Sequence, residues 1–399
     1  MYVTSSIKQY SWYAWFIAWF ACGMMIVSNG MMITGLSIYD EMLIKEFGWT
    51  LSEYKFSNLI SLTVAGLCAP FSGYIIDRFG TRVCILIGWT TLAIAYLFFS
   101  RIQSIQQLYF VHFLFGMTLT LVGLNVAVSI CSSWANKNKR GMAVGIAIAG
   151  SSLGGIMFPF IERVLLMNLD WRATMFCIAF VPMLLFFVSL FTVFDNQLGK
   201  KQSTQAIEGI AYREAVRSVP FWALVIIACA TFYSILGAQG HLFLYTRGVG
   251  FDIAKAANAV SLFFTFSLLG KFIFGYLADL FKMRLVFYAN LSIMLLGGIF
   301  LTSLSPSLIY PGMICFGLGW GGVYTLIQYS VVSIFGLRDI GKIIGTITML
   351  DAIAGGLGIF LSGVIKTAYN SYQPVFLVYV GMIIISLLSL WFVKPISRD

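Results

Sequence analysis

The chain alternates between apolar runs of about twenty residues, the length that crosses a bilayer as a helix, and short polar connections. This pattern predicts twelve membrane spans, and we therefore expect an all-α membrane protein. The spans are expected at residues 12–38, 55–76, 83–101, 106–132, 141–166, 173–194, 219–244, 256–279, 285–304, 309–334, 341–366 and 373–393.

One polar segment is longer than the others and has no apolar stretch to bury. It covers residues 195–218 and contains Lys200 and Lys201. We expect it to be a cytoplasmic linker between a six-helix bundle at 1–194 and a second six-helix bundle at 219–399.

Composition excludes a soluble protein. Of the 399 residues, 60% are hydrophobic and 10% are charged, whereas soluble domains carry about 25% charged residues. The formal net charge of +10 does not indicate a nucleic-acid partner, because the basic residues lie in short loops between spans. With the N-terminus inside, sixteen Lys and Arg fall in cytoplasmic segments and eight in outer ones. This excess predicts both termini in the cytoplasm. We expect a multi-pass protein of the cell (inner) membrane.

A ten-residue loop occurs twice, 202 positions apart. Residues 73–82 read Gly-Tyr-Ile-Ile-Asp-Arg-Phe-Gly-Thr-Arg, and residues 275–284 read Gly-Tyr-Leu-Ala-Asp-Leu-Phe-Lys-Met-Arg. Gly, Tyr, Asp, Phe and the final Arg keep their positions. A polar loop that recurs between apolar helices predicts two structurally equivalent, pseudo-symmetric halves.

The first copy resembles the loop motif of the major facilitator superfamily of secondary transporters. Five further stretches resemble its branch of monocarboxylate porters and oxalate/formate antiporters, namely Glu46–Trp49, Trp134 with residues 140–151, Trp171–Ala173, Phe221–Trp222 and Gly319–Gly322. The resemblance implies the major facilitator fold and alternating access, in which the two bundles rock about a site near the midplane.

The loop motif carries the predicted gate. Asp77 lies at a helix end, where it can pair with Arg78, Arg82 or the positive end of a neighbouring helix, and Asp279 repeats its position. Gly73 is expected to let its helix press against a neighbour. A simpler interpretation remains open, in which Asp77 only fixes the loop.

Two ionisable residues lie deep in apolar spans. Lys271 is eight residues before Asp279, about 12 Å along a helix, and Asp351 is ten residues after Gly341, about 15 Å. A charge near the bilayer centre costs about 3 kcal/mol, so such residues usually face a cavity and have a partner.

These two residues carry the predicted chemistry. In the resembled branch a cation on span eight binds the substrate carboxylate, and Lys271 stands where that branch usually has Arg. Asp351 departs from the oxalate/formate antiporters, which carry a cation on span eleven, so dicarboxylate exchange is not favoured. We expect Lys271 to bind the anion, and Asp351 to neutralise Lys271 and to carry a proton. The alternative is a permanent structural ion pair.

Neutral polar residues in the spans complete the predicted site. Asn29 and Asn125 are mid-span amides that must find partners in lipid, and Tyr324 matches the aromatic region near the substrate in the resembled family. All three are expected to line the substrate cavity, with helix–helix hydrogen bonding as the alternative. His112 is a weaker candidate for proton relay, and His241 for an interfacial or gating residue.

No nucleotide-binding loop and no nucleophile–base arrangement is apparent, so we expect neither an enzyme nor a cofactor. The favoured hypothesis is a monomeric proton symporter of a small organic anion, a monocarboxylate. The alternatives are an exporter or importer of a drug, siderophore or other metabolite, and a membrane sensor that does not transport.

Overall fold

The computed structural model describes residues 11–135, 139–195, 209–336 and 338–394, without the side chains of Ser11, Asp77 and Arg140. Much of the predicted linker, including Lys200 and Lys201, lies outside these residues. Internal contacts group the chain into two compact units. The first is Met1–Trp49 with Thr63–Gln205, and the second is Thr50–Leu62 with Ala206–Asp399.

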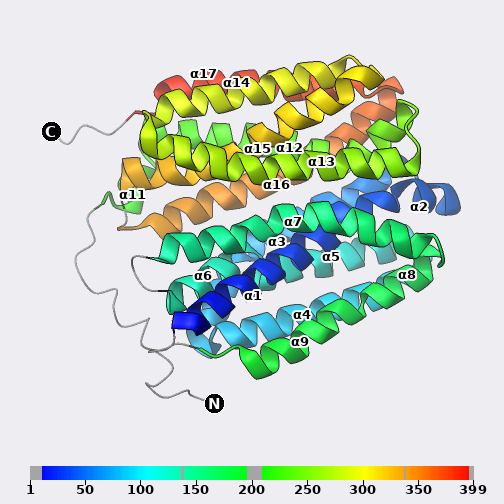
Figure 1. Ribbon diagram of the computed structural model, residues 1–399, viewed down its shortest axis with the longest axis horizontal. Helices are drawn as coiled ribbons and strands as arrows, with labels where there is room; N and C mark the ends of the chain where they lie inside the picture. The colour runs from blue at the N-terminus through cyan, green and yellow to red at the C-terminus, as the bar shows by residue number, and fades with distance from the viewer. Residues whose placement is uncertain (1–10, 136–138, 196–208, 337, 395–399) are drawn as a thin grey trace. The chain divides into compact units, whose positions relative to one another are not determined.

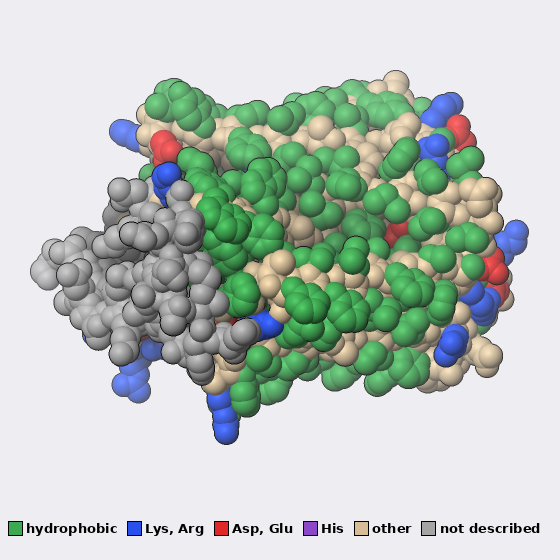
Figure 2. Space-filling model, turned by 60° about the horizontal axis from the view of Figure 1, so that its bottom comes forward, with side chains coloured by type: hydrophobic (Ala, Val, Ile, Leu, Met, Phe, Trp, Pro, Cys, Tyr) green, Lys and Arg blue, Asp and Glu red, His purple; other side chains and the backbone are tan. Residues whose placement is uncertain are grey.

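Eleven helical segments in the described residues are long and apolar enough to cross a membrane. The twelfth predicted span corresponds to the 30-residue helix α15. On the face drawn in Figure 2, hydrophobic side chains cover the lengths of the helices, and charged side chains gather towards their ends.

The first unit contains spans one to six. They are α1 (Ser11–Asn29) continued by η2 (Gly30–Thr34) and η3 (Gly35–Ile38), then α3 (Leu51–Phe79), α4 (Thr81–Phe99), α5 (Ile105–Val122) with α6 (Leu124–Trp134), α7 (Arg140–Leu166), and α8 (Trp171–Ile178) with α9 (Phe180–Thr192). The first turns of α3 group with the second unit. The short helix α2 (Asp40–Phe47) follows span one.

Three spans of this unit are interrupted. Span one changes from an α-helix to a π turn and then to a 3₁₀ turn at Gly30 and Gly35. Span four breaks at Gly123, which has an extended backbone and caps α6. Span six breaks at Ala179, because Pro182 has no N–H to bond with the carbonyl of Ile178. Around these breaks, α1 packs along α7 (Figure 1), and α4 packs on α5 and α9.

The second unit contains spans seven to twelve, and its long helices are continuous. They are α12 (Val219–Gly248), α13 (Ile253–Leu280), α14 (Met283–Thr302), α15 (Pro306–Phe335), α16 (Ile340–Tyr369), and α17 (Gln373–Ser389) with η5 (Leu390–Phe392). The short helix α11 (Tyr212–Ala215) precedes them. Helix α12 packs on α16 and α17, α13 packs on α15, and α14 packs on α15 and α17 (Figure 1).

Glycines bring α13 and α15 into backbone contact. A Cβ on Gly317 would collide with the carbonyl of Phe263, and one on Gly321 with the carbonyl of Ser267. Small residues allow this close approach in lipid, where no hydrophobic force drives helices together. This close contact between α13 and α15 fixes the position of the turn of α13 that carries Lys271.

Candidate functional site

The second unit contains a small recess beside Asp351. Asp351 is 6% exposed on α16. Helices α15 and α16 each contribute four residues at spacings i, i+3, i+4 and i+7, which places each set on one helix face. The lining comprises Phe232 of α12, Tyr324, Ile327, Gln328 and Val331 of α15, and Ile344, Ile347, Thr348 and Asp351 of α16. Two predicted site residues, Tyr324 and Asp351, are therefore brought together.

Lys271 lies on an aromatic cluster on α13 and α15. Its Nζ is 5.9 Å from the centroid of the Trp320 ring. Trp320 stacks on Phe263 at 5.3 Å and meets Phe264 edge-on at 5.0 Å. A ring face attracts a cation, so this cluster holds the ammonium in place.

Lys271 is not among the described residues that line the recess of Asp351. Its pairing with Asp351 stays a prediction.

The two predicted asparagines differ. Asn29 ends α1, and its Nδ2 donates to the Met25 carbonyl at 3.4 Å, a contact within its own helix. Asn125 is exposed on the first turn of α6, directly after the break at Gly123.

Both histidines are buried. His112 packs edge-on against Phe115. His241 Nδ1 lies 3.2 Å from the Tyr372 hydroxyl, and its Nε2 lies 2.9 Å from the Ile359 carbonyl. The His241 ring therefore joins α12 to α16 and to the residue before α17, and its interfacial or gating role stays a prediction.

In the first loop motif the backbone turns sharply at Gly80, whose φ is 95°. Asp195 Oδ1 accepts hydrogen bonds from the backbone N–H of Thr81 at 2.7 Å and of Arg82 at 3.2 Å, which caps α4. The Arg82 guanidinium donates to the Leu190 carbonyl and lies 5.7 Å from the Phe194 ring centroid. The motif thus ties the start of α4 to the end of span six.

The gating assignments remain predictions. The side chain of Asp77 lies outside the described residues. Arg78 is exposed, donates to the Tyr74 hydroxyl and lies over the Phe79 ring. Asp279, in the second copy, is exposed at the end of α13.

The contact of Gly73 with a neighbouring helix stays a prediction. Gly73 is exposed, and a Cβ built there meets no heavy atom within 4 Å.

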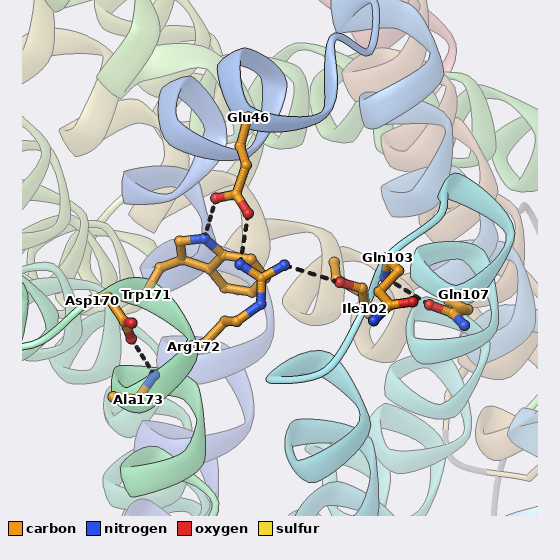
Figure 3. Close-up of polar contacts among 8 residues, drawn as sticks. All are labelled: Glu46, Ile102, Gln103, Gln107, Asp170, Trp171, Arg172 and Ala173. Carbon is orange, nitrogen blue, oxygen red and sulfur yellow. Dashed lines mark hydrogen bonds and ion pairs between the residues drawn. The ribbon is translucent and has the colours of Figure 1, made fainter.

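Two motif stretches far apart in the sequence meet between α2 and α8 (Figure 3). Glu46 Oε2 accepts from Trp171 Nε1 at 2.6 Å, and its Oε1 accepts from Arg172 Nη1 at 2.6 Å. The guanidinium stacks on the Trp171 ring at 4.2 Å. Hydrogen bonding by Arg172, and then by Trp171, lowers the pKa of Glu46.

Sequence reasoning missed three residues. Glu162 and Lys55 are buried in the structure, but each is near a span end, where a hydropathy window tolerates a charge. Lys55 Nζ donates to the Gly240 carbonyl at 2.6 Å. Asp195 was expected only as the start of the linker. Two signals for its role were available in the sequence. Asp195 directly follows the apolar run of span six, and Gly80 directly precedes α4.

Comparison with known proteins agrees with this architecture. The family model described as Major Facilitator Superfamily matches residues 20–359. The oxalate:formate antiporter of Oxalobacter formigenes is 23% identical over 360 residues, which is 86% of this chain and 84% of that protein. The probable nitrate/nitrite antiporter NarK1 of Thermus thermophilus is 23% identical over 343 residues, 78% of this chain and 76% of that protein.

Solved structures show the same fold. A bacterial homologue of the human lysosomal transporter Spinster, in an inward-facing and unoccupied conformation, superposes with a TM-score of 0.74 at 14% identity. The match covers 96% of this chain and 97% of that one. The predicted all-α, twelve-span fold is confirmed, and the chain belongs to the Major Facilitator Superfamily.

Proposed function

We propose that this protein is a secondary active transporter of a small organic anion, a monocarboxylate, driven by proton symport. The observation that carries the proposal is the position of Asp351. Its carboxyl group is buried in a membrane-spanning helix, yet it borders a recess instead of a close-packed core. An intramembrane carboxyl beside open space is the arrangement that proton-coupled carriers need.

Lys271 supplies the positive charge for the anion. It lies on a helix of the same unit, at a depth near the midplane, and Trp320 holds its ammonium group. We propose that the substrate carboxylate binds Lys271, and that Asp351 takes up a proton in the same cycle. The two named relatives are antiporters of small anions, which supports an anionic substrate.

Asn125 supports a polar path through the first unit. An exposed amide on a membrane-spanning helix is costly against lipid, so it indicates a surface that water or substrate reaches. Asn29 and Tyr324 are proposed to contact the substrate, and Asp77, Arg78, Arg82, Gly73 and Asp279 to act in gating on the cytoplasmic side.

A second candidate is a carrier of neutral or cationic metabolites or drugs. It is favoured by the lining of the recess, where the described residues include Asp351 and several apolar side chains but no Lys or Arg. The two candidates differ in the charge of the substrate.

Uptake of labelled monocarboxylates into proteoliposomes, with and without an imposed pH gradient, tests the proposal. We expect accumulation driven by an inward proton gradient. Lys271→Gln should abolish substrate binding, and Asp351→Asn should remove the dependence on the gradient. Lys366→Gln is the matched control, because Lys366 also lies over a ring, that of Tyr372 at 5.5 Å.

Unchanged affinity in Lys271→Gln would remove Lys271 from the site. Uptake that needs a preloaded anion and ignores the pH gradient would replace symport by exchange. Saturable transport of organic cations alone would favour the second candidate.

A further inference from the structure

Glu162 is a buried carboxyl group that the proposed cycle does not use. It lies on α7 in the first unit and its side chain is fully buried, at 0% exposure. Among the described residues, neither carboxyl oxygen has a hydrogen-bond partner. Burying a carboxyl group without a hydrogen-bond partner lowers the stability of the fold, so its presence here points to a functional role.

The carboxyl group lies at the irregular part of span one. Helix α7 presents Gly150, Gly154, Phe158 and Glu162 to that span at four-residue intervals. They face Cys22, Ile26, Gly30 and Gly35 in turn. The spacing on span one is four, four and then five residues, so the π turn of η2 inserts one residue.

The inserted residue makes room for Glu162. A Cβ on Gly35 would collide with both oxygens of the carboxyl group. π turns occur mostly as single bulges, frequently at functional sites. The irregular backbone and the acid therefore form one local arrangement.

On the described elements packed against α7, no cation is placed to balance a charge on Glu162. On α7 itself, the guanidinium of the adjacent Arg163 lies over the Phe160 ring, 5.9 Å from its centroid. Of the elements packed on α7, the described α1, η2, η3 and α6 contain no Asp, Glu, Lys, Arg or His, and Arg172 of α8 is bonded to Glu46. Tyr96 of α4 is within electrostatic range of Glu162, but its hydroxyl donates to the Met31 carbonyl at 2.8 Å. Tyr39 and Asp40, which follow η3, are also buried.

Burying an ionised carboxylate without a donor costs far more than burying the neutral acid. The packing around Glu162 thus suits the protonated form. Ionisation would release one proton to water and leave a carboxylate that needs donors. Those donors become available if Gly30–Ile38 moves away and admits water.

We propose that Glu162 is a proton-binding site of the first unit, and that loss of its proton opens the η2–η3 segment. This site adds to the proposed proton coupling, and a role for Glu162 in transport rests on that coupling. The protonation itself needs no substrate and can be tested alone.

Hydrogen–deuterium exchange of the full chain in nanodiscs, without substrate, tests the proposal. Protection factors for peptides covering Gly30–Ile38, corrected for intrinsic exchange, are compared across pH. We expect protection in the wild type to fall by up to about tenfold per pH unit once Glu162 ionises. In Glu162→Gln, which keeps the shape of the neutral acid, protection should not depend on pH.

Asp351→Asn is the matched control, and it should keep the wild-type dependence on pH. A wild-type profile in Glu162→Gln would overturn the proposal, and so would no dependence on pH in the wild type. The same loss of protection on adding Na⁺ at constant pH would also overturn it, since the site would then bind a metal cation.

Infrared spectroscopy of the wild type gives a readout that does not depend on the variant folding. We expect a protonated-carboxyl band that disappears as the pH rises and shifts on ¹³C-labelling of glutamate. If all labelled protonated-carboxyl bands have already disappeared below pH 5, the assignment to Glu162 fails. Failure of anion uptake in proteoliposomes would leave both results unchanged, so the two proposals can be distinguished.

Discussion

Arg82 and Arg284 occupy equivalent positions in the two units. Arg82, at the start of α4, donates to the Leu190 carbonyl and lies over Phe194. Arg284, at the start of α14, donates to the Trp391 carbonyl at 2.5 Å, and its guanidinium lies 5.2 Å from the centroid of the Trp391 ring. Each arginine ties the third helix of its half to the end of the sixth. The repeated loop therefore has a packing role in both halves.

Replacing either arginine with Gln should destabilise its own unit. A hydrogen bond from a charged group contributes about 1.5–3 kcal/mol, and each variant also loses a contact with an aromatic ring. We expect Arg82→Gln and Arg284→Gln to lower the melting temperature in detergent by several degrees. Arg78→Gln is the control, because Arg78 is exposed. Equal melting temperatures in all three variants would contradict this role.

Gly80→Ala should destabilise the folded protein, whereas Gly73→Ala should not. At Gly80 the φ of 95° disfavours a side chain, and a Cβ would collide with the carboxylate of Asp195. We expect a loss of more than about 1 kcal/mol in the free energy of unfolding.

At Gly73 a Cβ meets nothing within 4 Å. Alanine there should be neutral or should stabilise the helix by up to about 1 kcal/mol. Uptake measured on the same variant tests the gate, since a fall in transport with unchanged stability would show that Gly73 is needed in another state.

Glu46 should make the protein sensitive to acid. Its folded pKa lies below the usual value of 4.5, because Arg172 and Trp171 hydrogen-bond to the carboxylate. The stabilisation is therefore fully present above the unfolded pKa and is lost as the pH falls through the lower folded value. The side chains of Glu46 and Arg172 are both 39% exposed, so solvent screening keeps the effect small.

Melting temperatures from pH 7 to pH 3 measure the contribution of Glu46. We expect the wild type to lose more stability than Glu46→Gln below about pH 4.5. Arg172→Gln and the double variant complete a double-mutant cycle. A pH profile shared by the wild type and Glu46→Gln would show that the ion pair does not contribute.

Gly321→Ala should separate α13 from α15 next to Lys271. The new methyl group would collide with the Ser267 carbonyl and approach the backbone nitrogen of Lys271 at 2.8 Å. Overpacking of this kind costs about 1–3 kcal/mol, and the shift of α13 should raise the KM for the anion.

Gly345→Ala on α16 is the control for Gly321→Ala, because nothing lies within 4 Å of a Cβ there. We expect it to keep wild-type affinity and stability. Equal affinity in the two variants would mean that the close contact between α13 and α15 does not position Lys271.

The fold was predictable because span length and hydropathy depend only on local sequence. That Tyr324 and Asp351 both line one recess agrees with the resemblance, which places an aromatic residue near the substrate, and with the depth of Asp351 in its span. The surroundings of Glu162 could not be predicted, because they depend on a one-residue change of register between α1 and α7. Lys55 was missed for a related reason, since its burial depends on the packing of a helix end.

The extra residue in the π turn of span one has a geometric consequence. Each residue advances an α-helix by about 100° of rotation, so converting η2 to regular α geometry would turn η3 by about that angle about the helix axis. The result would be a screw motion limited to one end of the span, which swings Leu36 and Ile38 away from their present neighbours. A carrier built in this way could change which side chains one helix end presents while the rest of that helix stays in place.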